Sequence, residues 1–243
     1  MRFVRIVEEV RTREDLAVAM TAVTNRLGFQ YFALTHHVDI VEASGTAIRL
    51  HDYPAQWADY YDGHGLGVSD PVHRASHVTG AGFVWSDLGS MIPLTPADRQ
   101  MLELGRAQGI GNGFTVPSHV PGEARGSCSF VNDAERPMPA TMLPLAQFAG
   151  TFAFEGARRL WSRRGHPVAP VRPVLTDRQR DCLLWAARGK TDWEIGGILE
   201  IAQETVIRHL KDARERYGVH NRTSLVIRAM FDGTLSFTDV LKR

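Results

Sequence analysis

The sequence is poor in the features that mark membrane-spanning and disulfide-rich proteins. Two cysteines occur in 243 residues, Cys128 and Cys182, and they form neither a metal-ligand spacing nor a disulfide framework. No apolar run approaches the roughly 20 residues that a transmembrane helix requires. Acidic residues interrupt the apolar stretch at residues 1–15, so it contains no signal-peptide core. These absences predict a reduced, cytoplasmic protein with no membrane partner.

An excess of charge is also missing. Lysine and arginine number 28 against 27 Asp and Glu, which leaves a net charge of +1 at pH 7 with neutral histidines. Residues 172–243 nevertheless hold 13 basic and 10 acidic side chains, whereas the remainder holds 15 basic and 17 acidic ones. A difference of this size is weak evidence for nucleic-acid binding by itself, but it indicates two unlike parts.

A proline-rich stretch, GHPVAPVRPV at residues 165–174, divides the chain. Its prolines recur at every third position, which excludes a helix interior and favours an extended, fairly stiff connector. We therefore predict an N-terminal domain over residues 1–164 and a C-terminal domain over residues 175–243. With 44% hydrophobic residues, the chain can bury one large core or two smaller ones.

The N-terminal part combines helix-like and strand-like segments. Apolar residues recur at helical spacing over residues 12–27 and 137–164, and Pro144 is tolerated because it lies near the start of the second helix. Five segments are rich in aromatic and β-branched residues, as strands are, at residues 31–37, 46–53, 82–87, 112–119 and 126–133. Further helical patterns fall at residues 54–62, 71–79 and 95–108. Helices at both ends with strands between them predict an α+β or α-β-α layered domain.

The C-terminal part contains four short helical patterns and no convincing strand. Thr176 is a suitable N-cap for the first helix, and the third covers residues 203–217. The apolar side chains of that third helix share one face, which consists of Val206, Leu210, Ala213 and Tyr217. Other faces of its N-terminal half carry Thr205, Ile207, Arg208 and Lys211.

A short helix, a tight turn and a longer basic helix form the geometry that places side chains in the major groove of DNA. Arginine suits a guanine edge because its planar fork donates two hydrogen bonds, and lysine supplies a point charge to base or phosphate. A solvated basic face on a small helical bundle has the same spacing. The spacing alone therefore leaves both interpretations open.

The stretch DYPAQWADYYDGHGLGVSDP, residues 52–71, is unusually aromatic. Tyr53, Trp57 and Tyr61 recur every four residues, which predicts that they line one side of a short helix. Such a stripe fits ordinary core packing as well as a pocket wall. Asp70 before Pro71 is equally open, because an aspartate followed by proline is a good helix start in its own right.

The sequence of the C-terminal segment resembles that of the DNA-binding domain of LuxR-type transcription regulators. The positions that carry this resemblance are Leu175, Thr176, Gly189, Lys190, Thr191, Glu194, Ile195, Thr205, Val206, His209 and Leu210. Two positions depart from the family pattern: Gln179 replaces a usual glutamate, and Ala202 replaces a serine that caps the third helix. The loss of that cap should destabilise the helix by roughly 1 kcal/mol, which Glu204 in the first turn partly offsets.

The N-terminal half is similar to the autoinducer-binding domain of quorum-sensing receptors of the same family. The family pattern is met by Trp57, Tyr61, Asp70–Pro71, Trp85 and Gly113. This resemblance implies an α-β-α sandwich with a five-stranded, mainly antiparallel sheet, followed by an all-α domain of four helices. It also implies an N-acyl-homoserine lactone ligand and no other cofactor.

The resemblance assigns roles that make physical sense. Trp57 would donate its indole N–H to the lactone carbonyl, and Asp70 would accept the amide N–H of the ligand. Tyr53 and Ser129 would donate to the acyl carbonyl, while Tyr61 and Trp85 would form apolar walls. A mostly apolar cavity with a few convergent polar groups suits a small amphipathic ligand.

Other classes of protein are less consistent with the sequence. An enzyme lacks support because GSCS is not a nucleophile elbow, and His73 and His77 have no HExxH context or nearby carboxylate ligand. These histidines are better explained as a satisfied or exposed pair, and Cys128 as a small buried hydrophobe. A response regulator would need a βα-repeating receiver domain, which the order of segments does not provide.

The sequence therefore predicts a quorum-sensing transcription regulator that binds palindromic operator DNA as a homodimer. Dimerisation is expected along the long helix around Leu145–Trp161, supported by the last helix of the DNA-binding domain. RNA polymerase is a further expected partner. The alternative is a LuxR-type regulator that responds to a different small molecule or to none.

Overall fold

The computed structural model describes residues 2–38, 47–121, 123–162 and 173–241 of the chain. Its contacts divide the chain into two compact units, one formed by residues 1–120 with 124–168 and one by residues 121–123 with 169–243. Most of the predicted proline-rich connector lies outside the described residues. No helix of the described part of the chain is long and apolar enough to cross a membrane.

The first unit is built on a five-stranded antiparallel sheet, which confirms the predicted fold class. The strands are β1 (Tyr31–His36), β2 (Arg49–His51), β3 (Phe83–Val84), β4 (Asn112–Ser118) and β5 (Gly126–Asn132). Their order across the sheet is β2-β1-β5-β4-β3, and each neighbouring pair runs antiparallel. This arrangement is incompatible with the parallel sheet of a βα-repeating receiver domain.

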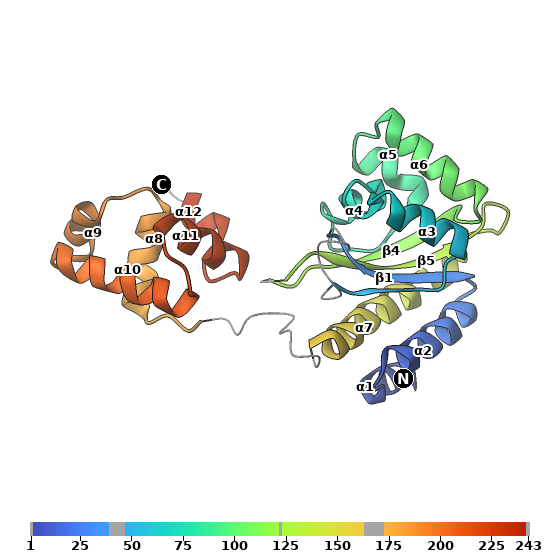
Figure 1. Cartoon of the computed structure of the whole chain (residues 1–243), viewed down its shortest axis with the longest axis horizontal. Helices are drawn as coiled ribbons and strands as arrows, with labels where there is room; N and C mark the ends of the chain where they lie inside the picture. The colour runs from blue at the N-terminus through green and yellow to red at the C-terminus, as the bar shows by residue number, and fades with distance from the viewer. Residues whose placement is uncertain (1, 39–46, 122, 163–172, 242–243) are drawn as a thin grey trace. The chain divides into compact units, whose positions relative to one another are not determined.

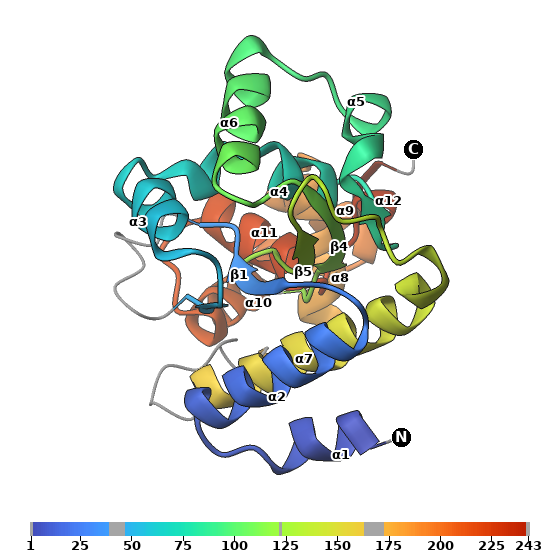
Figure 2. The ribbon, with the colours of Figure 1, turned by 90° about the vertical axis from the view of Figure 1, so that its right-hand side faces the viewer.

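Helices cover both faces of the sheet (Figures 1 and 2). One face is covered by α2 (Arg13–Arg26) and α7 (Leu143–Ser162), and α1 (Arg2–Glu9) packs against these two helices. The other lies against α3 (Ala55–Gly63), α4 (Pro71–Ser76), α5 (Leu88–Met91) and α6 (Pro96–Ala107). Single turns of 3₁₀ helix occur at Leu66–Val68, Trp85–Asp87 and Ala140–Met142. The short helices α1 and α5 were not predicted from the sequence.

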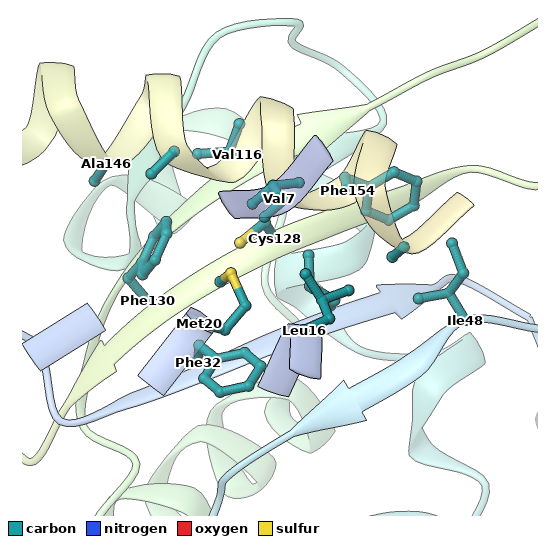
Figure 3. Close-up of a cluster of buried hydrophobic side chains, with 14 of the residues drawn as sticks. Val7, Leu16, Met20, Phe32, Ile48, Val116, Cys128, Phe130, Ala146 and Phe154 are labelled. Atoms are coloured by element: carbon teal, nitrogen blue, oxygen red, sulfur yellow. The ribbon is translucent and has the colours of Figure 1, made fainter. Parts of the chain in front are cut away.

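Alternation along the strands separates two kinds of side chain. Phe32 and Leu34 of β1 and Phe130 of β5 point to the α2 and α7 side, where they are fully buried with Met20 and Phe154 (Figure 3). This face holds the main hydrophobic core of the unit. The residues that alternate with these along the strands point to the opposite face, toward α3, α4 and α6.

The described residues of the second unit form helices and no strand. The helices are α8 (Asp177–Ala187), α9 (Asp192–Leu199), α10 (Gln203–Tyr217), α11 (Arg222–Phe231) and α12 (Phe237–Leu241). The first four match the predicted helices, whereas α12 was missed because its five residues are too few to show a period. Thr176 caps α8 as predicted, and Gln179 completes a capping box with it. The replacement of glutamate at this position therefore keeps the capping contact.

Candidate functional site

A cavity of about 50 Å³ lies between the sheet and the helices α3, α4 and α6. Aromatic and apolar side chains surround a few polar groups in its wall. It is lined by Ala33, Thr35, Arg49, Tyr53, Trp57, Tyr61, Asp70, Val72, His73, Trp85, Met101, Leu102, Gly105, Ile110 and Ser129. The six residues predicted to bind a ligand are all in this wall. A space of this volume admits a few water molecules, so a larger ligand must push the lining side chains apart.

Some hydrogen-bond donors in the wall have no partner among the described residues. Trp57 is 4% exposed and packs its ring against Gly105 of α6, where an added Cβ would lie 3.3 Å from the indole. Neither the indole N–H of Trp57 nor the hydroxyl of Tyr53 is hydrogen-bonded within the described part of the chain. Burial is the main cause that raises the pKa of Tyr53, so its hydroxyl stays protonated and available as a donor.

Tyr53 does not lie on the helix that carries Trp57 and Tyr61, so the predicted helical stripe of three aromatics is wrong at its first member. Helix α3 begins at Ala55, and its N-cap Pro54 has an extended backbone with ψ 132°. Tyr53 instead continues the chain beyond β2 and packs edge-on against Tyr31, with ring centroids 6.4 Å apart. It reaches the same cavity from the sheet side.

The carboxylate of Asp70 makes one contact as a helix cap and one in the cavity. Its Oδ1 accepts a hydrogen bond of 2.7 Å from the backbone N–H of Val72 and so caps α4. Its Oδ2 accepts a hydrogen bond of 2.7 Å from the hydroxyl of Tyr61. Burial, together with the charge of Asp70 and this hydrogen bond, raises the pKa of Tyr61 well above its usual value. Helix capping and a place in the cavity wall were alternatives for Asp70 in the sequence analysis. The two are compatible, because each uses a different oxygen of the carboxylate.

A short polar chain runs along the opposite wall. The indole N–H of Trp85 donates to Thr115 Oγ1 at 2.8 Å, and Thr115 Oγ1 lies 2.8 Å from Ser129 Oγ. The Trp85 ring lies over Gly113, where an added Cβ would come within 2.3 Å of it. This close approach explains why the pattern has glycine at that position. Trp85 is thus positioned both by its hydrogen bond to Thr115 and by the close packing of its ring on Gly113.

Sequence reasoning missed two kinds of wall residue. Arg49 of β2 forms an ion pair of 2.6 Å with Asp62 of α3, and its guanidinium lies 5.4 Å from the centroid of the Tyr61 ring. Met101 and Ile110 come from the α6 region, which carries no distinctive motif. The pairing of Arg49 with β1 becomes visible only when the strand register is known.

The histidines considered as a metal pair belong to a hydrogen-bonded network. His73 Nδ1 lies 2.8 Å from the carbonyl oxygen of Gly67, and His77 Nε2 lies 2.9 Å from His37 Nδ1. Among the described residues, no group of three or more His, Cys, Asp or Glu side chains is placed to hold a metal ion. Cys128 is fully buried, and burial raises the pKa of its thiol far above the usual value.

The candidate DNA-reading surface lies on α10 in the second unit. Val206, Leu210, Ala213 and Tyr217 are buried in that unit's core, as the helical spacing predicts. Ile207, Arg208 and Lys211 are exposed, while Thr205 is half-buried. Lys211 Nζ lies 3.9 Å from Glu215 on the same helix, a weak exposed pair that leaves the ammonium free to meet a phosphate. As predicted, Ala202 provides no side-chain cap for α10.

The turn between α9 and α10 depends on two residues that the sequence analysis did not single out. Glu200 has φ 55°, a left-handed conformation that is unusual for a side chain other than glycine. An added Cβ on Gly196 would lie 2.8 Å from the carbonyl oxygen of Ile201. Gly196 therefore lets the chain turn back tightly against α9, which sets the direction of α10.

The helix proposed for dimerisation is only partly available. Leu160 and Trp161 are buried in their own unit, with 7% and 3% exposure, and the Trp161 indole donates to the carbonyl oxygen of Ala47. Leu145 is 55% exposed, and Phe148 and Phe152 are half-buried with ring centroids 4.7 Å apart. Leu160 and Trp161 are therefore occupied within their own unit, whereas side chains in the first half of α7 are available for a contact.

An enclosed aromatic pocket in one unit and a helix-turn-helix in another define a ligand-responsive DNA-binding regulator. The comparisons with known proteins agree. An autoinducer binding domain model matches residues 12–157, and a model of bacterial regulatory proteins of the luxR family matches residues 173–229. The chain belongs to the LuxR family of transcriptional regulators, which are not enzymes.

Individual relatives cover different shares of the chain. The protein y4qH of Sinorhizobium fredii is 30% identical over 187 residues, which make up 76% of this chain but only 56% of that protein. The transcriptional activator protein BjaR1 of Bradyrhizobium diazoefficiens is 30% identical over 89% of this chain and 87% of its own. The structure of SdiA in complex with octanoyl-rac-glycerol has a TM-score of 0.64 at 22% identity, covering 95% of this chain and 93% of SdiA. The last comparison shows a shared fold.

Proposed function

We propose that the protein is a quorum-sensing transcription regulator that binds an N-acyl-homoserine lactone in the cavity and palindromic operator DNA as a homodimer. The observation that carries this proposal is the convergence of two unpaired donors and one carboxylate in a single apolar cavity. Trp57 and Tyr53 offer N–H and O–H groups to the two carbonyl oxygens of such a ligand. Asp70 offers an acceptor to its amide N–H.

The remaining assignments follow from the wall geometry. Tyr61 and Trp85 present aromatic surface to the ligand, and each is oriented by a hydrogen bond of its own. Ser129 stands between Thr115 and the cavity, so its hydroxyl can turn toward an acyl carbonyl. Occupation of the cavity fills it with apolar contacts, which stabilises the folded state.

The DNA-binding half of the proposal rests on α10. Arg208 and Lys211 are exposed on one side of a helix whose other side is anchored in a core, as a recognition helix requires. Two copies related by a two-fold axis would read two half-sites, which is why a palindrome is expected. The exposed first half of α7 and the exposed apolar residues Ile227 and Phe231 of α11 offer surfaces for that dimer.

The wider proposal keeps the domain limits given by the sequence. Residues 1–164 would bind ligand and dimerise, residues 165–174 would link the domains, and residues 175–243 would bind DNA. The protein would act in the cytoplasm, with RNA polymerase as a further partner. The second candidate is a response to another amphipathic molecule with an amide or ester, because the same donors and acceptor would serve it.

Thermal melts of the full chain with a panel of N-acyl-homoserine lactones test the ligand class. A true ligand at a hundredfold excess over its Kd should raise the free energy of unfolding by about 2.7 kcal/mol. The variant Trp57→Phe, which keeps an aromatic ring but loses the N–H, should lose most of this shift. Trp193→Phe is a matched control, because Trp193 is 74% exposed on α9 and belongs to the other unit, outside the cavity lining.

Three results would overturn parts of the proposal. If no member of a broad panel moves the melting midpoint, the ligand class is wrong. If Trp57→Phe retains the full shift, the indole does not hold the ligand. If the ligand-bound protein elutes as a monomer and binds an isolated half-site as tightly as a palindrome, the homodimer is wrong.

A further inference from the structure

One end of the cavity is bordered by a polar row that crosses three strands. The strand register pairs Thr35 of β1 with Arg49 of β2 on one side and with Ser127 of β5 on the other. Directly paired residues of antiparallel strands point to the same face, so these three side chains lie on the cavity side of the sheet. The next row, Ala33 and Ser129, is two residues away, a distance of roughly 6.7 Å along the strand.

His73 of α4 lies opposite this row and presents a hydrogen-bond acceptor to it. Its Nδ1 lies 2.8 Å from the carbonyl oxygen of Gly67, which can only accept, so Nδ1 carries the ring proton. In the neutral ring Nε2 is then an acceptor, and it lies 3.3 Å from Thr35 Oγ1 and 4.0 Å from Asp70 Oδ2. The position of Nε2 links the polar row to the carboxylate proposed to hold the ligand amide.

Arg49 presents a donor at the same level. Its Nε and one terminal nitrogen both contact the carboxylate of Asp62, at 3.2 Å and 2.6 Å. The other terminal nitrogen has no partner within the described residues. Because the ion pair already neutralises the guanidinium, the free N–H suits a neutral oxygen better than a second carboxylate. The side chain is 14% exposed, so bulk water satisfies this N–H only in part.

Ser127 is not available in the same way. Its hydroxyl lies 2.9 Å from His37 Nε2, and the His37 ring stacks on His73 with centroids 3.9 Å apart. This stack holds His73 in place from behind. His73 Nε2 already accepts from the Thr35 hydroxyl at 3.3 Å. The groups left to meet a ligand are therefore the lone pairs of Thr35 Oγ1 and the free N–H of Arg49.

A plain hydrocarbon tail that reached this row would leave the free N–H of Arg49 and the lone pairs of Thr35 Oγ1 without a hydrogen bond, which is unfavourable. We propose that the row recognises the distal end of the ligand's acyl group, and that the preferred ligand has a short tail ending in a neutral oxygen such as a hydroxyl. The hydroxyl would accept from Arg49 and donate to Thr35 Oγ1, whose own hydrogen is directed to His73 Nε2. This inference rests on the proposed function, because it assumes the lactone and amide sit at Trp57 and Asp70.

Matched ligand pairs test the inference on the parent protein. The probes are N-hexanoyl-homoserine lactone and its ω-hydroxy derivative, with N-dodecanoyl-homoserine lactone as a long hydrocarbon comparison. Titration calorimetry should give a Kd for the hydroxy ligand at least about tenfold below that of the hexanoyl ligand, and weaker binding still for the dodecanoyl ligand. Equal or tighter binding of either hydrocarbon tail would overturn the inference and leave the proposed function standing. If none of the three binds and the broader panel also fails, the proposed function itself is wrong.

Two variants locate the preference. Thr35→Val keeps the shape of the side chain but removes the hydroxyl, and Arg49→Met removes the free N–H. Each should bring the ratio of the two Kd values below about threefold, mainly by weakening the hydroxy ligand. Thr24→Val is the matched control, because Thr24 is fully buried in α2 and its hydroxyl has no partner in the described structure. A preference unchanged in both row variants would place tail recognition elsewhere and overturn the assignment.

Discussion

The replacement of Asp70 by asparagine separates the two contacts of that side chain. The backbone N–H of Val72 needs only one oxygen, and asparagine caps a helix about as well as aspartate. The amide oxygen of the introduced side chain can therefore keep the contact of 2.7 Å that now involves Oδ1. Its NH₂ group would then face the Tyr61 hydroxyl, which can turn to accept from it instead of donating. The ligand-free fold should lose about 1 kcal/mol or less.

Ligand binding should suffer much more. In the proposed complex the Asp70 carboxylate would accept the ligand's amide N–H in a charge-assisted hydrogen bond, which is roughly twice as strong as a neutral one. In Asp70→Asn the group on the cavity side is a donor, so the ligand's N–H would meet another N–H. We expect a loss of about 1.5–3 kcal/mol, or roughly tenfold to a hundredfold in Kd.

Titration calorimetry with the best ligand of the panel measures this loss, and a melt without ligand measures the cap. Asp15→Asn is the matched control, because Asp15 receives a backbone N–H at the start of α2 and lies in the helical layer on the other face of the sheet. That variant should bind ligand as the parent does. If Asp70→Asn also has the parental Kd, Asp70 acts as a cap alone and the site loses its anchor for the ligand amide.

Three further predictions concern other parts of the molecule. Arg208→Ala should lose roughly 1–3 kcal/mol of sequence discrimination, and Lys211→Ala should lower the salt dependence of DNA binding. Both variants should bind ligand as the parent does. If both bind operator DNA as tightly as the parent, the DNA-binding surface lies elsewhere. Burial is the main cause that lowers the pKa of His36 from 6.5 to about 4, so on acidification His36 is protonated in the unfolded state before it is protonated in the folded state. The free energy of unfolding should therefore fall as the pH drops from about 6.5 toward 4, by up to about 1.4 kcal/mol per pH unit. A melting midpoint that stays constant between pH 6.5 and 5 would contradict this. Gly196→Ala should destabilise the second unit by about 1–3 kcal/mol in denaturant titrations. Gly197→Ala should not, because a Cβ added there meets nothing within 4 Å. Equal effects of the two variants would refute the role of Gly196 in the tight turn.

The sequence predicted those elements whose local pattern agrees with their environment. The five strands appear where aromatic and β-branched residues cluster, and the buried face of α10 follows its 3.6-residue period. All five strands are shorter than predicted, β1, β4 and β5 by one residue and β2 and β3 by more. The segment at residues 82–87 pairs only at Phe83–Val84, because the chain turns into a 3₁₀ helix at Trp85–Asp87. Local composition does not show where pairing stops.

The cavity required information that local patterns do not contain. The resemblance supplied Trp57 and Asp70. Tyr53 was wrongly placed on the same helix as Trp57, because a spacing of four residues does not show where a helix begins. Arg49 went unnoticed because its meaning depends on pairing with Thr35, which is a property of the sheet. The same holds for Gly196, whose role depends on a backbone contact across a turn.

The most direct test of the account is the identity of the molecule that the protein retains. The full chain would be expressed beside acyl-homoserine lactone synthases of different specificity, purified, and examined by native mass spectrometry before and after denaturation. The account predicts one retained N-acyl-homoserine lactone per protomer in the parent protein and none, or far less, in Trp57→Phe and Asp70→Asn. A parent protein that is folded but carries no such lactone, or retains it equally in both variants, would contradict the account.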